Sequence, residues 1–421
     1  MKIMTLGEAK FPSPVHHAAS HDTYVAGDIL RVLGEAPTTP DTLFEVAGPR
    51  AKLFFDPPQV RAGIVTCGGL CPGLNNVIRS AFHELHHAYG VKEVLGFRYG
   101  YEGLDPACGA EPMVLTSDLV DDIHREGGSI LGTSRGPVDI GIAVDNLIRR
   151  GINILFTVGG DGTQRGGNAL FQEARQRGYP LAVVGIPKTI DNDVAYVSRT
   201  FGYLTAVEEA AKVIACAHME ARSVRNGVSI VKLMGREAGF VSAGATVASQ
   251  DVNFTLVPEV PFALDGENGF LAALKKRVLR RSHAVIVVAE GAGQDLLDAD
   301  PNARDASGNK KLGDIGIFLR DRIAAYFKTE QVAATIRYFD PSYIIRSVSA
   351  DSEDAVLCDL FARNAVHAAM AGKTGLVIGL LHDLFTHVPI EKLVEQKKRL
   401  KPDGDAWRSV LAATGQPVRF F

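Results

Sequence analysis

The sequence contains no long apolar segment and no large excess of charge of one sign. No run of about eighteen apolar residues exists, so we expect no transmembrane helix. The formal net charge is −3, which offers no global basic field for nucleic acid or an anionic membrane surface. The first residues also lack the apolar core of a signal peptide. We therefore expect a soluble cytoplasmic protein that binds anionic ligands through local lysine and arginine side chains.

Cysteine is scarce, and it does not form a disulfide or metal pattern. The five cysteines are scattered and odd in number, so reduced thiols are expected. Cys67 and Cys71 loosely resemble a metal knuckle, but no second pair completes four ligands. We interpret three histidines on a predicted helix as part of a polar face, namely His83, His86 and His87.

The chain is too long for a single hydrophobic core. Its 421 residues, of which 46% are hydrophobic, suffice for two or three. Residues 1–60 are interrupted by prolines and predict an extended or partly helical arm. Short apolar runs then predict strands at 62–66, 91–97, 152–158, 181–186, 227–233, 284–289 and 333–337. Amphipathic runs predict helices at about 75–89, 142–150, 164–177, 203–220, 236–248, 264–281, 313–327 and 352–372.

This alternation predicts an α/β fold made of two doubly wound parallel-sheet lobes. The active site is expected in the cleft between them, at the carboxyl ends of the strands. We expect the lobes to cover 61–200 and 201–350, and a C-terminal helical segment, 351–421, to pack back on them. The polar stretch 295–311 is predicted to be a mobile loop.

A glycine-rich loop with one carboxylate follows the predicted strand at 152–158. It reads GGDGT at 159–163, and helical sequence comes after it. A strand, a glycine turn and a helix N-terminus together expose backbone amides that suit polyphosphate, and Asp161 is a residue type that holds Mg²⁺ on phosphate oxygens. The alternative is a tight turn with no ligand. Two more loops of this kind begin with Gly68 and Gly127, and the second contains Arg135, which could reach a phosphate or form a surface ion pair.

Paired carboxylates follow the predicted strand at 181–186. The sequence PKTIDND at 187–193 places Asp191 and Asp193 two positions apart, beside a hydroxyl and an amine. Close carboxylates raise each other's pKa, which suits a base that removes a proton from an alcohol. We assign Asp191 as the base and Asp193 to a supporting, metal-proximal role. A turn or helix cap is the alternative.

These motifs together resemble the 6-phosphofructokinase family. GGDGT alone also occurs in lipid kinases and NAD kinases. In this chain it is preceded by CGGLCPGLN and followed by PKTIDND and LMGREAG, in the family's order, over a stretch from Arg61 to Ser347. The resemblance implies a glycolytic enzyme that phosphorylates the 1-hydroxyl of fructose 6-phosphate with MgATP. It also implies a homo-oligomer, either a dimer or a tetramer, and control by allosteric effectors, none of which the sequence identifies.

The resemblance also implies roles for individual residues. Asp191, Asp193 and Arg236 would be catalytic, and Asp161 would hold Mg²⁺. In the lobe at 61–200, the nucleotide would be bound by Gly69, Arg135, Gly136, Gly160, Asp161, Gly162, Thr163 and Lys188. The sugar phosphate would be bound by Thr189, Ile190, Asp191, Met234, Gly235, Arg236, Glu290, Arg337, Tyr343, Ile344, Ile345 and Arg346. Arginines are the residues of choice for a phosphate monoester.

One arginine that many bacterial members carry is absent, because position 227 is Gly227. In the family, some arginines of the sugar-phosphate site come from a neighbouring subunit. Arg222 or Arg225 is the candidate replacement for that contact.

Two positions bear on the phosphoryl donor. Pyrophosphate-using relatives typically have aspartate at the position of Gly162, where a carboxylate would occupy the space of the α-phosphate of ATP. Lys188 points the other way, since it occurs in pyrophosphate users. A branch of ATP-dependent members carries both residues and a long amino-terminal arm, and the chain resembles that branch. We therefore expect ATP, with pyrophosphate as the alternative.

Two other classes of function remain to be weighed. A non-catalytic nucleotide sensor on the same scaffold would not need Asp191 or the arginine set, so the presence of these residues argues against a sensor. A dehydrogenase is disfavoured because no G-x-G-x-x-G turn after a first strand is followed by an acidic residue about 20 positions later.

Overall fold

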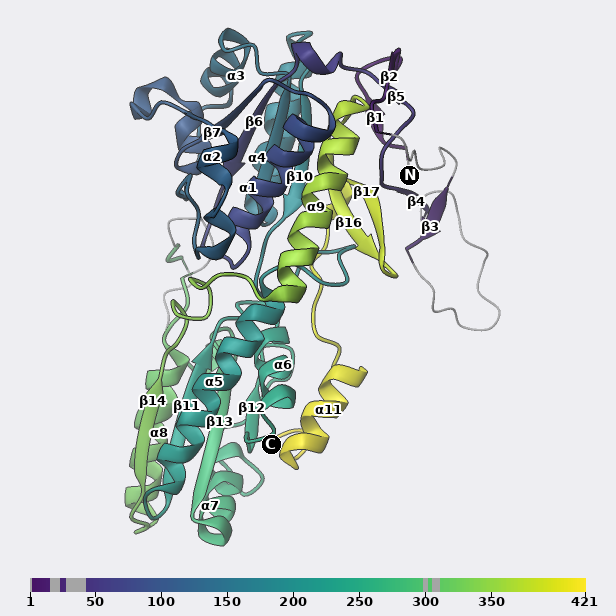
Figure 1. Ribbon diagram of the computed structural model, residues 1–421. Coiled ribbons are helices and arrows are strands. Elements are labelled where there is room, and N and C mark those ends of the chain that lie inside the picture. Colours follow the sequence, from purple (N-terminus) through teal and green to yellow (C-terminus); the bar gives the residue numbers. More distant parts are fainter. Residues whose placement is uncertain (1, 16–22, 28–42, 298–301, 305–310) are drawn as a thin grey trace, which may run out of the picture. The chain divides into compact units, whose positions relative to one another are not determined.

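The computed structural model describes residues 2–15, 23–27, 43–297, 302–304 and 311–421 (Figure 1). The chain forms two compact units, and each consists of segments that are separated in sequence. The first unit contains Met1–Thr189, Val194–Gly202 and Val348–Lys397. The second contains Ile190–Asp193, Tyr203–Ser347 and Lys398–Phe421. The chain therefore passes between the units five times, and two of these crossings lie at the two ends of Ile190–Asp193, in the predicted catalytic loop.

The first unit is built on a nine-stranded sheet in the order β3-β4-β17-β16-β10-β9-β6-β7-β8. Its centre is parallel and consists of β6 (Arg61–Thr66), β7 (Glu93–Phe97), β9 (Ile154–Gly159), β10 (Ala182–Pro187) and β16 (Leu376–Leu381). Every residue of β9, β10 and β16 is buried, as expected for strands covered on both faces. Antiparallel strands complete the edges: β3 (Tyr24–Ala26), β4 (Leu43–Val46), β17 (Leu384–Pro389) and β8 (Met113–Val114).

Helices cover both faces of this sheet. On one face, α3 (Ile140–Arg149) and α4 (Asp161–Gln176) pack apolar side chains against β6, β7, β9 and β10. On the other, α9 (Ser352–Met370) contacts β9, β10 and β16 and runs beside α1 (Leu74–His83) (Figure 1). Two shorter α-helices, α2 (Ser117–Val120) and α10 (Ile390–Val394), also lie in the described part of this unit. Asp139 caps α3 by accepting a hydrogen bond from the amide of Ile142 (3.0 Å).

The described part of the amino-terminal arm is extended. β1 (Met4–Thr5) pairs with β15 (Lys373–Thr374), and β2 (Phe11–Pro12) pairs with β5 (Lys52–Leu53). β3 and β4 join the large sheet through β17. The arm is therefore fastened to the first unit by strand pairing.

The second unit contains a parallel four-stranded sheet in the order β12-β13-β11-β14. The strands are β11 (Gly227–Leu233), β12 (Phe254–Leu256), β13 (His283–Ala289) and β14 (Thr335–Phe339). α7 (Phe270–Arg281) and α8 (Ile315–Thr329) share a core with one face. α5 (Tyr203–Arg222) and α6 (Phe240–Ser249) contact the other, and α11 (Asp405–Thr414) packs on α6.

These elements confirm the α/β fold with parallel sheets that the alternation predicts. The segment 351–421 differs from its prediction, because it contains β15, β16 and β17 as well as helices. The helix predicted at about 75–89 ends at His83 and continues as a π-helical turn, Glu84–Ala88. Most of the stretch 298–310, within the predicted mobile loop, lies outside the described residues. None of the helices in the described part of the chain has both the length and the apolar character of a membrane span.

Candidate active site

The predicted donor loops meet at one place in the sheet of the first unit. β7 lies on one side of β6 and β9 on the other, so the direction of the connections reverses between β6 and β9. In open parallel sheets, ligands bind at such a switch point, outside the carboxyl ends of the strands. Gly69 follows β6 and Gly160 follows β9, so the two predicted phosphate loops flank the switch point.

The GGDGT loop leads directly into α4. Asp161 is the first residue of this helix, and its side chain is 17% exposed. Among the described residues, no side chain caps the helix at Gly160. First-turn amides have no partners within a helix and, with the helix dipole, favour an anion.

Packing does not explain two of the glycines in this loop. A Cβ atom on Gly162 would meet no described atom within 4 Å, and one on Gly160 would meet the carbonyl oxygen of Lys188 at 3.6 Å, an ordinary contact. Neither residue has a positive φ. Glycine in a helix is less stable than alanine by about 0.5–1 kcal/mol, so a helix start alone gives no reason for Gly162. Neither packing nor a positive φ therefore accounts for these glycines, and the absence of side chains leaves the backbone here open to a ligand.

Lys188 and Gln164 hold the loops after β6, β9 and β10 together. Lys188 is 6% exposed, and its ammonium donates to the carbonyl oxygen of Gly69 while its backbone N–H donates to that of Gly159 (3.1 Å). The amide of Gln164 donates to the carbonyl oxygens of Gly159 (2.9 Å) and Ile186 (3.4 Å). The loop of Arg135 joins them, because Gly68 donates to the carbonyl oxygen of Ser134 (3.0 Å). The first unit thus brings its predicted donor residues to one edge of its sheet: Gly69, Arg135, Gly136, Gly160, Asp161, Gly162, Thr163 and Lys188.

The predicted base lies in a short segment that belongs to the second unit. The first unit includes Thr189, whereas Ile190–Asp193 is part of the second. Asn192 is buried and has a φ of 54°, a left-handed conformation that asparagine tolerates. Asp191 and Asp193, the residues on either side of it, are both partly exposed.

The loops after β11 and β13 of the second unit lie side by side. Glu290 donates its N–H to the carbonyl oxygen of Leu233 (2.9 Å), and Gly291 donates to that of Gly235 (3.1 Å). This pairing brings Met234, Gly235 and Arg236 close to Glu290. Burial raises the pKa of Glu290, while the charges of Arg236, Lys232 and Arg346 oppose the rise. The Glu290 carboxyl therefore lies among cations, as a sugar-phosphate site requires.

The turn after β14 carries four more of the predicted residues. Tyr343 is 73% exposed, and the guanidinium of Arg346 lies over its ring at 4.9 Å from the centroid. Ile344 is also exposed, whereas Ile345 is fully buried and anchors the turn. Arg346 is therefore held close to Glu290 by a packed turn.

Arg337, in contrast, does not join Arg236 and Arg346 beside Glu290 in this structure. It lies in β14 opposite Ser229, well before the carboxyl end of β11. Its guanidinium contacts Glu220 of α5, through the carboxylate (2.9 Å) and the carbonyl oxygen (3.1 Å). Its role in phosphate recognition, and those of the exposed Arg222 and Arg225, remain predictions.

Packing in the second unit requires glycine at position 227. A Cβ atom at this position would lie 2.1 Å from the carbonyl oxygen of Ala221. No side chain fits there without moving the backbone, so the arginine that many bacterial members carry could not be accommodated.

Sequence reasoning missed three lysines near the site residues. Lys397 lies 4.0 Å from the carboxylate of Asp161, and Lys398 donates to Asn192. Lys232 binds Asp314 (3.0 Å) and Asp340 (2.9 Å) beside Glu290. The run 396–401 reads as a solvated polar stretch, and nothing in the sequence alone signals contact with these motifs.

The residues present fit a magnesium ion bound together with a phosphate ligand. The described residues contain no cluster of three or more His, Cys, Asp or Glu side chains that could hold a metal. Magnesium in nucleotide enzymes is commonly held by one or two carboxylates plus phosphate oxygens, which the partly exposed Asp161 can satisfy. Cys67 and Cys71 are buried, and burial raises the pKa of Cys67 to about 12, so this thiol stays protonated.

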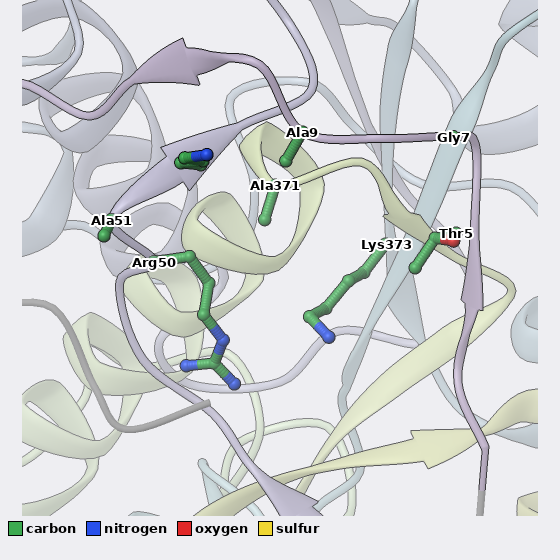
Figure 2. Close-up of a pocket in the computed structure, with 8 residues that line it drawn as sticks. Thr5, Gly7, Ala9, Arg50, Ala51, Ala371 and Lys373 are labelled. Carbon is green, nitrogen blue, oxygen red and sulfur yellow. The ribbon is translucent and has the colours of Figure 1, made fainter. Parts of the chain in front are cut away.

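A cavity of about 340 Å³ lies elsewhere in the first unit, beneath the amino-terminal arm (Figure 2). It is lined by Thr5, Gly7, Ala9, Arg50, Ala51, Lys52, Ala371 and Lys373, none of them a predicted site residue. Nearby, the buried carboxylate of Glu45 accepts hydrogen bonds from Arg50 (2.9 Å) and Lys373 (2.7 Å). Burial alone would raise the pKa of Glu45, but His387, Lys373 and Arg50 outweigh it and hold the pKa well below its usual range. This ion cluster fastens the arm.

Comparison with known proteins gives consistent matches. Residues 61–369 match the phosphofructokinase family. The chain is 45% identical to an ATP-dependent 6-phosphofructokinase of Borreliella burgdorferi, covering 99% of this chain and 97% of the relative. It is also 45% identical to one of Amycolatopsis methanolica, covering 100% and 95%. A pyrophosphate-dependent phosphofructokinase from Marinobacter aquaeolei has the same fold (TM-score 0.70, 19% identity, 86% of this chain and 93% of that one).

The family match covers most of the chain, and the relatives are similar over nearly their whole lengths. The glycine loops, the Ile190–Asp193 segment and the cations around Glu290 all fall within the matched residues. The chain therefore belongs to the phosphofructokinase family.

Proposed function

We propose that the protein transfers the γ-phosphoryl group of MgATP to O1 of fructose 6-phosphate, yielding fructose 1,6-bisphosphate and ADP. The observation that carries this proposal is the pair Gly160 and Gly162, which the fold does not require, beside Asp161 at the start of α4. The names of the relatives, ATP-dependent 6-phosphofructokinases, support both the reaction and the donor.

The chemistry needs a base, a nucleophile and a stabilised leaving group. The carboxylate of Asp191 takes the proton from the 1-hydroxyl, O1 forms a bond to the γ-phosphorus, and the bond from that phosphorus to the bridging oxygen breaks. The electron pair leaves with ADP. Positioning and charge neutralisation supply most of the rate in phosphoryl transfer.

Two groups of residues divide the binding. Backbone amides of the α4 first turn, with Lys188 and Arg135, would hold the donor phosphates. Magnesium held by Asp161 would neutralise charge on the transferred group. Arg236 and Arg346 would bind the 6-phosphate, and Glu290 would accept hydrogen bonds from the sugar hydroxyls.

Replacement of the base tests the mechanism. Asp191→Ser should lower kcat by about 10²- to 10⁴-fold and change the KM for fructose 6-phosphate much less, because the proton transfer occurs only in the reaction step. Steady-state kinetics with both substrates varied would measure this. A variant with wild-type kcat would show that Asp191 is not the base.

Pyrophosphate is the second candidate donor. Lys188, buried against the donor loops, is the observation that favours it, because an extra cation suits a small, highly charged donor. Turnover with ATP and with pyrophosphate, measured on one preparation at matched magnesium, separates the two. Faster turnover with pyrophosphate would overturn the ATP assignment.

The proposal extends to the oligomeric state and the cellular location of the protein. We propose a homo-oligomer, since exposed arginines such as Arg222 and Arg225 could complete a neighbouring subunit's phosphate site. We also propose a cytoplasmic location, because the proposed reaction belongs to glycolysis. Light scattering of the purified protein gives the oligomeric state, and a strictly monomeric, fully active enzyme would contradict shared sites.

A further inference from the structure

A lysine from the carboxyl-terminal part of the chain supports the segment that carries the predicted base. The ammonium of Lys398 donates a hydrogen bond to Oδ1 of Asn192 (2.8 Å), and its backbone N–H donates to the carbonyl oxygen of Asp193 (2.9 Å). All of these residues belong to the second unit. Lys398 therefore holds both the side chain and the backbone of the segment immediately after Asp191.

The conformation held in this way is an uncommon one. Asn192 is buried with a φ of 54°. Non-glycine residues in this region are uncommon and persist where the surrounding structure stabilises them. Two anchors from one residue are a direct means of such stabilisation, and they fix the direction in which the chain leaves Asp191.

Lys398 is itself held in place by the surrounding unit. Glu259 accepts hydrogen bonds from the amides of Leu400 (2.8 Å) and Gly239 (3.0 Å), which ties the segment to the amino end of α6. Leu400 is buried with Trp407 and Val257 in a small apolar cluster. The ammonium of Lys398 lies 5.2 Å from the centre of the Phe240 ring, at the start of α6. The anchor therefore rests on rigid structure.

The position is poorly suited to a lysine kept only for stability. Burial lowers the pKa of Lys398 to about 7, and the charge of Asp193 opposes this effect. A partly buried ammonium group favours folding little or not at all, because desolvation offsets its interactions. Replacement by an apolar side chain of similar length removes this desolvation cost but also the hydrogen bond to buried Asn192, so the free energy of unfolding should fall by no more than about 1–3 kcal/mol.

We propose that Lys398 is a positioning residue for the phosphoryl transfer: acting through Asn192, it holds Ile190–Asp193 in the conformation in which Asp191 accepts the proton of the sugar hydroxyl. The inference rests on the proposed function. A misplacement of about 1 Å in a catalytic group can lower the rate by about 10²-fold, so the effect belongs in kcat.

The test compares Lys398→Met, Lys398→Arg and the matched control Lys401→Met in the full-length protein. Lys401 is exposed on the same stretch of chain. We expect Lys398→Met to lower kcat by about 10- to 100-fold, with KM for fructose 6-phosphate changed by less than about threefold. The variant should remain folded at the assay temperature, with a loss of stability of no more than about 1–3 kcal/mol. Lys398→Arg, which keeps a donor and a charge, should recover part of the loss, and Lys401→Met should match the wild type.

A double-mutant cycle with Asn192→Gly identifies the route of the effect. Glycine adopts a positive φ freely, so this change removes the amide without straining the backbone. If Lys398 acts through Asn192, the double variant should lose little more kcat than the more impaired single variant. Additive losses, or a Lys398→Met variant with kcat equal to that of Lys401→Met, would overturn the inference.

The proposed function can fail separately. If Asp191→Ser is inactive while Lys398→Met keeps wild-type kcat, only the positioning role is wrong. If Asp191→Ser keeps full activity, the assigned base is wrong, and with it the reason for positioning this segment.

Discussion

Gly162 offers a test in which stability and activity should change in opposite directions. The residue lies in the first turn of α4, and a Cβ atom there would meet no described atom within 4 Å. Gly162→Ala should therefore raise the free energy of unfolding by about 0.5–1 kcal/mol, the usual difference between glycine and alanine in a helix. Gly162→Asp should also be at least as stable as the wild type, because a carboxylate in a first turn interacts favourably with the helix dipole, by about 0.3–1 kcal/mol.

The same carboxylate should impair the use of ATP. If the α-phosphate lies beside the first turn of α4, two like charges about 4 Å apart at an effective dielectric constant of about 20 repel by about 4 kcal/mol. With magnesium offsetting part of this charge, we expect a loss of about 2–4 kcal/mol, or about 30- to 700-fold in kcat/KM for ATP. The alanine variant adds no charge, so its loss should be smaller.

The assay combines urea unfolding with steady-state kinetics at saturating fructose 6-phosphate. Pyrophosphate is measured as the second donor on each variant, because it has no α-phosphate and should be affected less. The reasoning would be refuted if Gly162→Asp kept the ATP kinetics of the wild type. It would equally be refuted if Gly162→Ala destabilised the protein by more than about 1 kcal/mol, since the glycine would then have a packing role.

Three further predictions concern buried groups. Burial raises the pKa of Glu290, so its contribution to stability is complete below about pH 4.5 and declines as the pH rises through its folded pKa. Glu290→Gln should therefore stabilise the protein at neutral pH while raising KM for fructose 6-phosphate about tenfold, and lower stability at pH 7 would contradict this. Gly227→Ala places a Cβ atom 2.1 Å from the carbonyl oxygen of Ala221 and should destabilise by about 1–3 kcal/mol in urea unfolding, in contrast to Gly162→Ala. Glu45→Gln leaves the buried Arg50 and the partly buried Lys373 without their carboxylate and should destabilise by about 3–5 kcal/mol at pH 7. Because partners hold the pKa of Glu45 low, its stabilising effect is present above about pH 4.5 and lost as the pH falls, so unfolding of the variant between pH 5 and about 3 should depend less on pH than that of the wild type.

The central strands of both sheets could be predicted because their sequences are continuous apolar runs. β9 and β10 are buried at every position, and the glycine and Asp191 loops directly follow them. β16 and β17 were not predicted, although Leu376–Leu381 is equally apolar. β16 pairs with β10, although all four strands of the second unit's sheet lie between these two strands in the sequence. Local sequence carries no information about a pairing between such distant segments.

Within the candidate site, glycine and proline motifs mark their residues as candidates in the sequence, whereas an isolated cation carries no such signal. Lys398 contacts Asn192 only because Glu259 and the cluster around Trp407 fix its segment. The resemblance assigns Arg337 to phosphate recognition, and the register of β14 places its side chain beside Glu220, so that role stays a prediction. In both cases the deciding contact joins residues far apart in sequence, and the side chain alone gives no sign of it.

The discontinuous first unit has a consequence for synthesis of the chain. All four strands of the second unit's sheet leave the ribosome before β16 does. Until then β10 is the outermost strand of the parallel core made so far, and its unpaired backbone groups can pair with another nascent chain. A chain ending shortly after β14 would contain a complete smaller sheet and an open larger one. We expect such truncated products to aggregate through β10, and addition of the missing carboxyl-terminal fragment to restore solubility if it supplies β16.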